Sequence, residues 1–303
     1  MMRCVRLLGL DLSTGTLEEA IQCLGERPPE LPFDYVVTPN VDHFVRLSRA
    51  RALRWVYDEA WLRLLDSRVL ARSAWLLGLR PPRVVTGADL TEAILQSHLR
   101  PGERITIVGL RPDLLPVLVR RYRLSAPAHH YPPFDFDHDV DALAEAVRFV
   151  VQNPARFVFL AVGSPRQEML AAAIKATGRA TGIGLCVGAS LDFLTGGQRR
   201  APRSVQLAGL EWLFRLVREP RRLAGRYLCN GPRIVALLWQ ELRAKPAGKA
   251  ADSARPGDPG RTGQPPPASD RAGQQTEHFP ADARQHGAAM RCIRAAQIGA
   301  RRA

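Results

Sequence analysis

The chain has 303 residues, with 43 lysines and arginines against 29 acidic residues and a formal net charge of +14. Its five cysteines are widely spaced and form no Cys-x-x-Cys pair, which excludes a disulfide framework and a zinc-finger pattern and favours a reducing cytosol. The apolar run at residues 7–10 is too short for a signal peptide, and no run approaches the roughly 18 residues of a membrane-spanning helix. We therefore expect a protein that can lie on a membrane but does not cross one.

The positive charge is concentrated in the C-terminal third. Residues 1–195 hold 23 basic and 21 acidic residues, whereas residues 196–245 hold 11 basic and 3 acidic residues. A nearly neutral first part followed by a basic segment favours an anionic surface as partner, either phospholipid or nucleic acid.

The first two thirds alternate predicted strands and helices. Runs of β-branched and aliphatic residues predict strands at residues 5–12, 34–37, 104–109, 156–163 and 182–188. Amphipathic segments between them predict helices, including one capped at Ser13-Thr14, one over residues 41–54 and a hydrophobic one just before Asp66. This alternation predicts an α/β fold with a doubly wound, Rossmann-like parallel sheet and right-handed crossovers.

The pattern changes after residue 195. Residues 205–218 predict a helix that ends before Pro220, and Gly231-Pro232 predict the start of a last amphipathic helix. Residues 246–303 hold too few apolar side chains to offset the entropy of ordering, so we predict that they are disordered. The predicted organisation is a core at 1–195, a basic amphipathic appendage at 196–245 and a low-complexity tail at 246–303.

Polar turns follow several predicted elements, at Thr38-Pro39-Asn40, at Asp66-Ser67 and at residues 163–168. Strand ends host ligands in α/β sheets. In the third turn Gly163 lets a ligand approach the backbone, Ser164 offers a hydroxyl, and the following helix N-terminus attracts phosphate. An ordinary turn or helix start remains the alternative for each. The sequence has neither Gly-x-Gly-x-x-Gly nor a Walker phosphate loop, which argues against dehydrogenases and kinases.

The acidic run at residues 135–139 resembles a metal-binding motif of many nucleotide-sugar enzymes. It lies in a proline-rich linker rather than at a strand end, and short acidic runs are common in solvated loops. We therefore expect no metal site there, and we expect His129-His130 to be surface residues.

The basic appendage carries arginines spaced three or four residues apart, at Arg215, Arg218, Arg222 and Arg226. On a helix they would share one face, opposite apolar residues. A solvated basic face is the alternative, but the neighbouring tryptophans favour an anionic partner. Nucleic acid is the less favoured partner, because the chain contains no recognised DNA- or RNA-binding motif.

Taken in series, these motifs resemble the WecG/TagA/CpsF family of bacterial glycosyltransferases, glycosyltransferase family 26. The resemblance extends in order over about residues 5–240. It rests on residues 38–43, 83–90, 162–168, 188–193, 200–202, 209–216, 219–222 and 226–227.

The resemblance implies an inverting hexosyltransferase that uses a UDP-sugar and needs no metal or other cofactor. The implied donor sugar is N-acetylmannosamine, its uronate or a related hexose. The implied acceptor is an undecaprenyl-diphosphate-linked saccharide, in cell-surface or exopolysaccharide biosynthesis. Such an enzyme would be cytoplasmic and peripherally bound to the anionic inner face of the plasma membrane, without nucleic acid, and is compatible with a homo-oligomer.

The resemblance also implies residue roles. Asp66 aligns with the family's proposed general base, and Thr38 and Asn40 would sit beside the sugar. The donor pocket would be lined by Ser164, Gln167, Gly188 and Asp192. Arginines of the appendage would neutralise the departing diphosphate, and we assign this role to Arg215, Arg222 and Arg226.

One position departs from the family pattern. The family usually has Asp-Gly at the base, whereas this chain has Asp66-Ser67. The carboxylate is kept and the flexible neighbour is lost. This departure motivates an alternative function, a catalytically silent family member that scaffolds polysaccharide-assembly enzymes.

Overall fold

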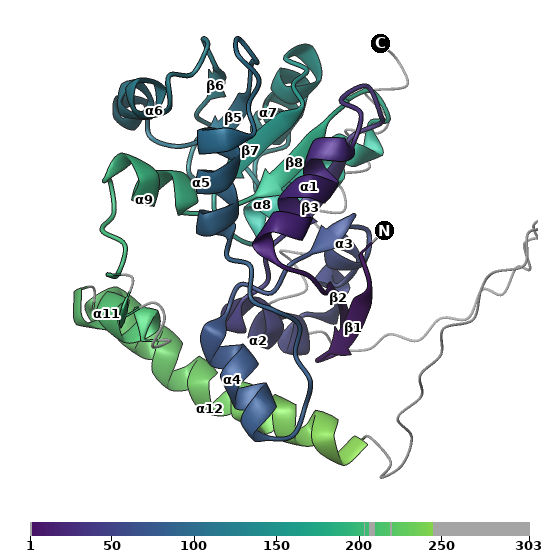
Figure 1. Ribbon diagram of the computed structural model, residues 1–303, viewed down its shortest axis with the longest axis vertical. Coiled ribbons are helices and arrows are strands. Elements are labelled where there is room, and N and C mark those ends of the chain that lie inside the picture. Colours follow the sequence, from purple (N-terminus) through teal and green to yellow (C-terminus); the bar gives the residue numbers. More distant parts are fainter. Residues whose placement is uncertain (1, 203, 206–209, 219, 245–303) are drawn as a thin grey trace, which may run out of the picture.

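The computed structural model describes residues 2–202, 204–205, 210–218 and 220–244 (Figure 1). Residues 246–303, for which we predict disorder, lie outside the described residues. Of the helices in the described ranges, none is both long enough and apolar enough to cross a membrane.

Six parallel strands form the central sheet, in the order β4-β3-β8-β7-β5-β6. They are β3 (Asp34–Val37), β4 (Leu62–Arg63), β5 (Thr106–Gly109), β6 (Ala128–His130), β7 (Phe157–Ala161) and β8 (Ile183–Cys186). The chain moves outward from β3 to β4, crosses to β5 and β6, and returns through β7 to β8 beside β3. The predicted α/β fold with a parallel sheet is confirmed, and the chain reverses its direction of winding next to β3 and β8, where such folds bind ligands.

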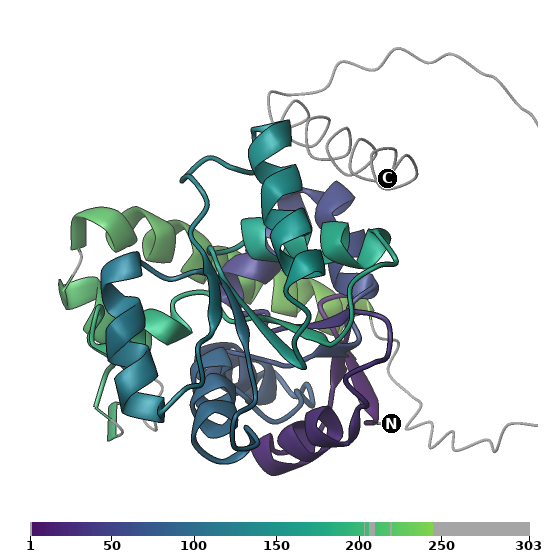
Figure 2. The ribbon, with the colours of Figure 1, turned by 90° about the horizontal axis from the view of Figure 1, so that it is seen from above.

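Side chains of the strands alternate between two apolar clusters, one on each face of the sheet. Tyr35 and Val37 belong to one cluster and Val36 to the other, as the period of two in a strand requires. Seen from above, helices lie on both sides of the sheet (Figure 2). Both faces are therefore buried, which explains why the central strands are almost entirely apolar.

The helices divide between the two clusters. One cluster is covered by α2 (Val41–Arg49), α3 (Trp55–Asp58), α4 (Arg68–Leu76), α7 (Val140–Gln152) and α8 (Arg166–Ala176). The other is covered by α1 (Leu17–Glu26), α5 (Gly87–Ser97), α6 (Leu115–Tyr122) and α9 (Ser190–Thr195). Two short 3-10 turns, η1 (Arg51–Leu53) and η2 (Pro112–Leu114), precede α3 and α6.

The N-terminal segment is a hairpin rather than the predicted single strand. β1 (Cys4–Leu7) and β2 (Leu10–Ser13) pair antiparallel around Leu8 and Gly9, whose φ angles of 49° and 80° are left-handed. The first helix begins later than predicted, because Thr16, and not Ser13-Thr14, caps it. Thr16 and Glu19 form a reciprocal capping box.

The segment before Asp66 is a strand, which corrects the predicted hydrophobic helix. β4 pairs with β3 through Val36 and Leu62, and Leu65 bridges in parallel to Val84. Two residues are too few to show an alternating pattern in the sequence. The correction matters, because it places Asp66 beyond the carboxyl end of a strand of the sheet.

The basic segment contains α11 (Glu211–Arg218) and α12 (Pro220–Ala244). The predicted break at Pro220 is confirmed, whereas the predicted helix start at Gly231-Pro232 is wrong, because α12 continues through Pro232. Figure 1 shows α12 running alongside α2 and α4. Its Ile234 and Leu238 are buried in the first apolar cluster.

Polar contacts also attach α12 to the core. The Asn230 Nδ2 donates to Asp42 Oδ1 at 2.8 Å. The backbone N–H of Leu8 donates to the Glu241 carboxylate, which ties α12 to the hairpin. The basic appendage is therefore packed onto the core along much of its length.

Candidate functional site

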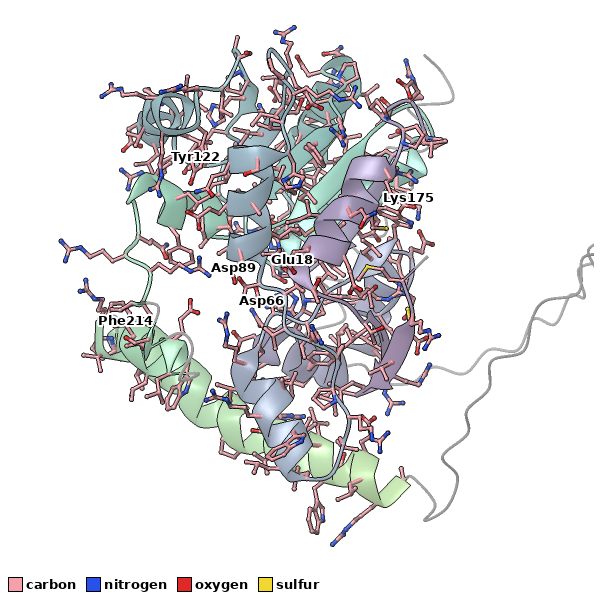
Figure 3. The ribbon with its side chains drawn as sticks, in the orientation of Figure 1. Glu18, Asp66, Asp89, Tyr122, Lys175 and Phe214 are labelled. Atoms are coloured by element: carbon pink, nitrogen blue, oxygen red, sulfur yellow. The ribbon has the colours of Figure 1, made fainter. Side chains whose placement is uncertain are left out.

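A pocket of about 1010 Å³ opens at the carboxyl ends of β4, β3, β8 and β7, four neighbouring strands. Each strand contributes the turn that follows it, and α11 and α12 line the other side with residues such as Trp212, Phe214 and Ile234. In Figure 3, Asp66 lies in the part of the core nearest these helices, and Phe214 lies on α11. A space of this size accommodates a sugar nucleotide.

The structure brings six of the predicted site residues together in this pocket. They are Thr38, Asn40, Asp66, Ser164, Gln167 and Gly188. They meet because they follow neighbouring parallel strands, whose carboxyl ends lie at one edge of the sheet.

Two hydrogen bonds to backbone groups hold Asp66, one through its own N–H and one through its carboxylate. Its own N–H donates to the Pro39 carbonyl at 3.0 Å, and its Oδ2 accepts from the N–H of Gly87 at 3.1 Å. Gly87 is the first residue of α5, so the carboxylate lies at a helix N-terminus, where the helix dipole favours negative charge. Ser67 caps α4 by accepting from Leu70 N–H at 3.1 Å.

Gly87 makes this arrangement sterically feasible. A Cβ at this position would lie 3.1 Å from Thr38 Oγ1, 3.5 Å from Ser190 Oγ and 3.6 Å from Asp66 Oδ2. Three polar side chains therefore converge on Gly87, and a Cβ there would crowd the Thr38 hydroxyl.

Thr38 and Asn40 both have hydrogen bonds within the protein. The Thr38 hydroxyl donates to the Cys186 carbonyl at 3.1 Å, which links the ends of β3 and β8. The Asn40 side-chain oxygen accepts from Asp42 N–H at 3.0 Å and caps α2. The helix-start interpretation of Asn40 is therefore correct, and the same residue also lines the pocket.

Gln167 joins two strand ends. Its Oε1 accepts from Gly188 N–H and its Nε2 donates to Glu168 Oε1, each at 2.8 Å. Since Gln167 is almost fully buried, both ends of its amide serve to fix the turns after β7 and β8. Ser164, in the same turn, accepts a hydrogen bond from Arg46 Nη1 at 2.7 Å.

Asp192 does not line the pocket, which corrects its predicted place in the donor site. It lies on α9, where its backbone carbonyl accepts from Gln198 N–H. Burial raises the pKa of its carboxyl, and the charge of Arg111 partly offsets this.

The predicted diphosphate-binding arginines lie on the two C-terminal helices, Arg215 on α11 and Arg222 and Arg226 on α12. Their side chains lie outside the described part of the structure. Other arginines line the pocket, namely Arg68, Arg166, Arg199, Arg200 and Arg218.

Arg200 fixes the start of the basic segment to α5. Its Nη2 binds Asp89 Oδ1 at 2.5 Å, and its Nη1 lies 3.9 Å from Glu92. Arg68 also pairs with Asp89, at 3.6 Å. One carboxylate therefore joins a core helix to the segment that leads to α11.

The acidic run at residues 135–139 has a structural use, because Asp139 caps α7 by accepting from Asp141 and Ala142 N–H. His129 is part of β6, and its Nε2 lies 2.9 Å from the Gly109 carbonyl oxygen. Across the described residues, no group of three or more His, Cys, Asp or Glu side chains is arranged to hold a metal ion.

Two residues of the site were not predicted individually, Gly87, which hydrogen-bonds to Asp66, and His43, which lines the pocket. Both fall within the motifs singled out in the sequence. Gly87 follows the helix cap Thr86. Its φ angle is not positive, so its backbone conformation does not require a glycine, and the close approach of neighbouring side chains is the reason for one. His43 lies one turn after Asn40 and is buried beside Tyr57. No sequence pattern distinguishes such a histidine from a core residue.

In a comparison with protein families, residues 5–248 match the model described as "Glycosyl transferase WecG/TagA/CpsF family". The matched range includes every strand of the sheet and both C-terminal helices.

Proposed function

The chain belongs to the WecG/TagA/CpsF family of glycosyl transferases, and we propose that it transfers a sugar from a UDP-sugar to a polyprenyl-diphosphate-linked saccharide with inversion. The family supports sugar transfer in the synthesis of cell-surface polysaccharides. The proposed donors are UDP-N-acetylmannosamine, its uronate or a related hexose. The proposed mechanism uses no metal.

The observation that carries the proposal is the position of Asp66. Its carboxylate lies in a pocket of sufficient size, at the end of an edge strand, and is held by the N–H of Gly87. In the proposed step this carboxylate accepts the proton of the acceptor hydroxyl while the acceptor oxygen bonds to the anomeric carbon. The bond from that carbon to the UDP oxygen breaks, and UDP leaves with its electron pair.

The leaving diphosphate needs positive charge at the moment the bond breaks. The pocket wall offers Arg199 and Arg218, both exposed, and Arg68 at the start of α4. We propose that Arg215, Arg222 and Arg226 add to this charge from α11 and α12. Their number in one segment supports this role, since acidic residues are few there.

A surface beside the pocket supports the proposed membrane partner. Trp75 and Leu76 at the end of α4 are 70% and 75% exposed, and Trp239 on the adjacent α12 is 45% exposed. The exposed face of α4 also carries Arg72, and α4 has no acidic residue. Exposed tryptophans beside arginines suit the headgroup region of an anionic bilayer.

We refer to Trp75, Leu76 and Trp239 as the wedge. Val69 and Ser73 of α4 and Val235 of α12 line the pocket, whereas the wedge residues on the same helices are exposed. A lipid-linked acceptor could therefore pass from a bilayer at the wedge to the pocket over a short distance.

The test is Asp66→Asn. We expect the variant to lose transfer to a polyprenyl-diphosphate saccharide by about 10³-fold, in line with the loss of a general base, while UDP still binds. Asp58→Asn on α3 makes the same charge change at an exposed position and serves as the matched control. Full activity of Asp66→Asn would contradict the assignment of Asp66 as the general base.

A further inference from the structure

His43 is a buried residue with one side open to the pocket. It lies on α2, is 5% exposed and contributes to the pocket wall. Its ring meets the ring of Tyr57 edge-on, with centroids 5.9 Å apart and planes at 78°. The mechanism proposed above does not use it.

The two ring nitrogens of His43 have different surroundings. Nδ1 lies 3.1 Å from the Tyr57 hydroxyl, whereas the nearest carboxylate oxygen, Glu168 Oε1, is 4.0 Å away and beyond hydrogen-bond distance. Within the described residues no protein group hydrogen-bonds to Nε2. Because Nδ1 is engaged on the buried side, Nε2 is the nitrogen left for the pocket.

The burial of Tyr57 fixes the direction of its hydroxyl proton. Tyr57 is 1% exposed, and His43 Nδ1 is the hydrogen-bond partner of its hydroxyl among the described residues. If the Tyr57 oxygen only accepted from His43, the hydroxyl proton would be buried without an acceptor, which costs more than a phenol oxygen that accepts nothing. Tyr57 therefore donates its proton to His43 Nδ1.

The charged and titratable groups around His43 come from three helices. They are Arg46 on α2, Tyr57 on α3 and Glu168 on α8. Burial, followed by the charge of Arg46, lowers the pKa of His43 to about 3. Burial also raises the pKa of Glu168. His43 is therefore neutral at pH 7 and carries a single ring proton, either on Nδ1 or on Nε2.

From this geometry we infer that His43 presents an Nε2–H donor to the pocket, set in that tautomer by Tyr57, and that this N–H binds an oxygen of the sugar nucleotide. The inference rests on the proposed function for the identity of the ligand. The tautomer itself is a property of the free protein. An uncharged donor suits either a sugar oxygen or a diphosphate oxygen.

The opposite hydrogen-bond direction has a distinct consequence. If His43 Nδ1–H donated to the Tyr57 oxygen, Nε2 would carry no proton and could only accept. Nitrogen-15 NMR of the imidazole distinguishes the two tautomers directly.

The first experiment is that NMR measurement on the ligand-free full chain. We expect the His43 signals of the Nε2–H tautomer, unchanged between pH 5 and pH 8. In Tyr57→Phe, which keeps the ring and removes the hydroxyl, we expect the tautomer preference to weaken. A wild-type Nε2 without a proton would overturn the inference.

The second experiment compares the affinities of UDP and a UDP-sugar. His43→Phe keeps a flat ring and loses the N–H, so binding should weaken about three- to tenfold, the effect of one neutral hydrogen bond. His43→Gln places an amide near the Nε2 position and should recover part of the loss. His138→Gln, at an exposed histidine outside the pocket, is the matched control.

Comparing the two ligands shows whether the oxygen bound by the His43 N–H belongs to the sugar or to the diphosphate. A loss for the UDP-sugar alone assigns the N–H to the sugar, and an equal loss for UDP assigns it to the diphosphate. Unchanged affinity for both ligands in His43→Phe would overturn the inference. A wild-type chain that binds neither ligand would instead contradict the proposed function, and the NMR result would still decide the tautomer.

Discussion

The two sides of the pocket are built differently. The pocket floor, formed by Thr38, Asp66, Gln167 and Gly188, is fixed by hydrogen bonds to backbone, including the N–H of Gly87, and to neighbouring strand ends. The pocket roof, formed by α11 and α12, is basic and amphipathic. The floor has the precision that bond-making needs, and the roof has the charge that a diphosphate and a membrane need.

The roof is nevertheless attached to the floor. Ile234 and Leu238 are buried in the core, and Asn230 bonds to Asp42 two residues after the helix cap Asn40. One face of α12 therefore sets its position while other residues remain for ligands. This difference predicts that substitutions in the pocket floor and substitutions in the pocket roof impair different properties of the protein.

After Asp66→Asn, the largest effect is expected from the roof charges. Arg215→Gln, Arg222→Gln and Arg226→Gln combined should lower turnover about 10²- to 10³-fold, because the diphosphate loses its neutralising partners. Steady-state kinetics with a short-chain acceptor measures this.

The matched control removes three positive charges elsewhere. Arg120, Arg148 and Arg179 are exposed and do not line the pocket, so their triple change to Gln should leave turnover close to wild type. Equal losses in the two triple variants would show that net charge, rather than the roof, is responsible.

The next effect concerns the floor. Gly87→Ala would place a Cβ 3.1 Å from Thr38 Oγ1, so the Thr38 side chain beside Asp66 must shift by a few tenths of an ångström. We expect turnover to fall about 10- to 100-fold. Gly225→Ala on α12, where a Cβ meets nothing within 4 Å, is the control. Normal turnover in Gly87→Ala would show that the floor tolerates displacement.

A smaller effect is expected at the wedge. Trp75→Ser with Leu76→Ser should weaken binding to anionic vesicles about tenfold, because two largely exposed apolar side chains no longer insert. Turnover of a short-chain acceptor in solution should not change. Vesicle flotation provides the measurement, and undiminished binding would exclude α4 from the membrane contact.

The last effect is on stability rather than on activity or membrane binding. The pKa of His43 falls from 6.5 to about 3 on folding, so its contribution to stability is present above pH 6.5 and is lost as the pH falls towards 3. In this window the slope is on the order of 1 kcal/mol per pH unit. His43→Phe should flatten the dependence of the unfolding free energy between pH 6.5 and pH 4, measured by urea denaturation. Parallel curves for the two proteins would contradict a buried neutral His43.

The central strands of the sheet were predictable, whereas the edge strand β4 and the N-terminal hairpin were not. The runs that contain β5, β7 and β8 are apolar and β-branched, and both faces of these strands are buried. β4 has two residues, and the β1–β2 turn depends on left-handed φ angles at Leu8 and Gly9. In α12, Pro232 indicated a helix start, but packing through Ile234 and Leu238 overrides that signal.

The site was predictable where chain position determines it. Thr38, Asn40, Ser164 and Gly188 follow strands, so the order of the sheet brings them together. Asp192 also follows a strand, but it lies within α9 and is not among the residues that line the pocket. The environments of Gly87 and His43 depend on contacts between distant segments, which no local pattern encodes.

The central claim is sugar transfer at the pocket floor, and UDP release tests it most directly. Wild-type protein is mixed with each candidate UDP-sugar, with and without a polyprenyl-diphosphate saccharide. We predict UDP release that requires the acceptor and that disappears in Asp66→Asn. Binding of UDP without release from any donor would contradict the claim and would favour a catalytically silent scaffold.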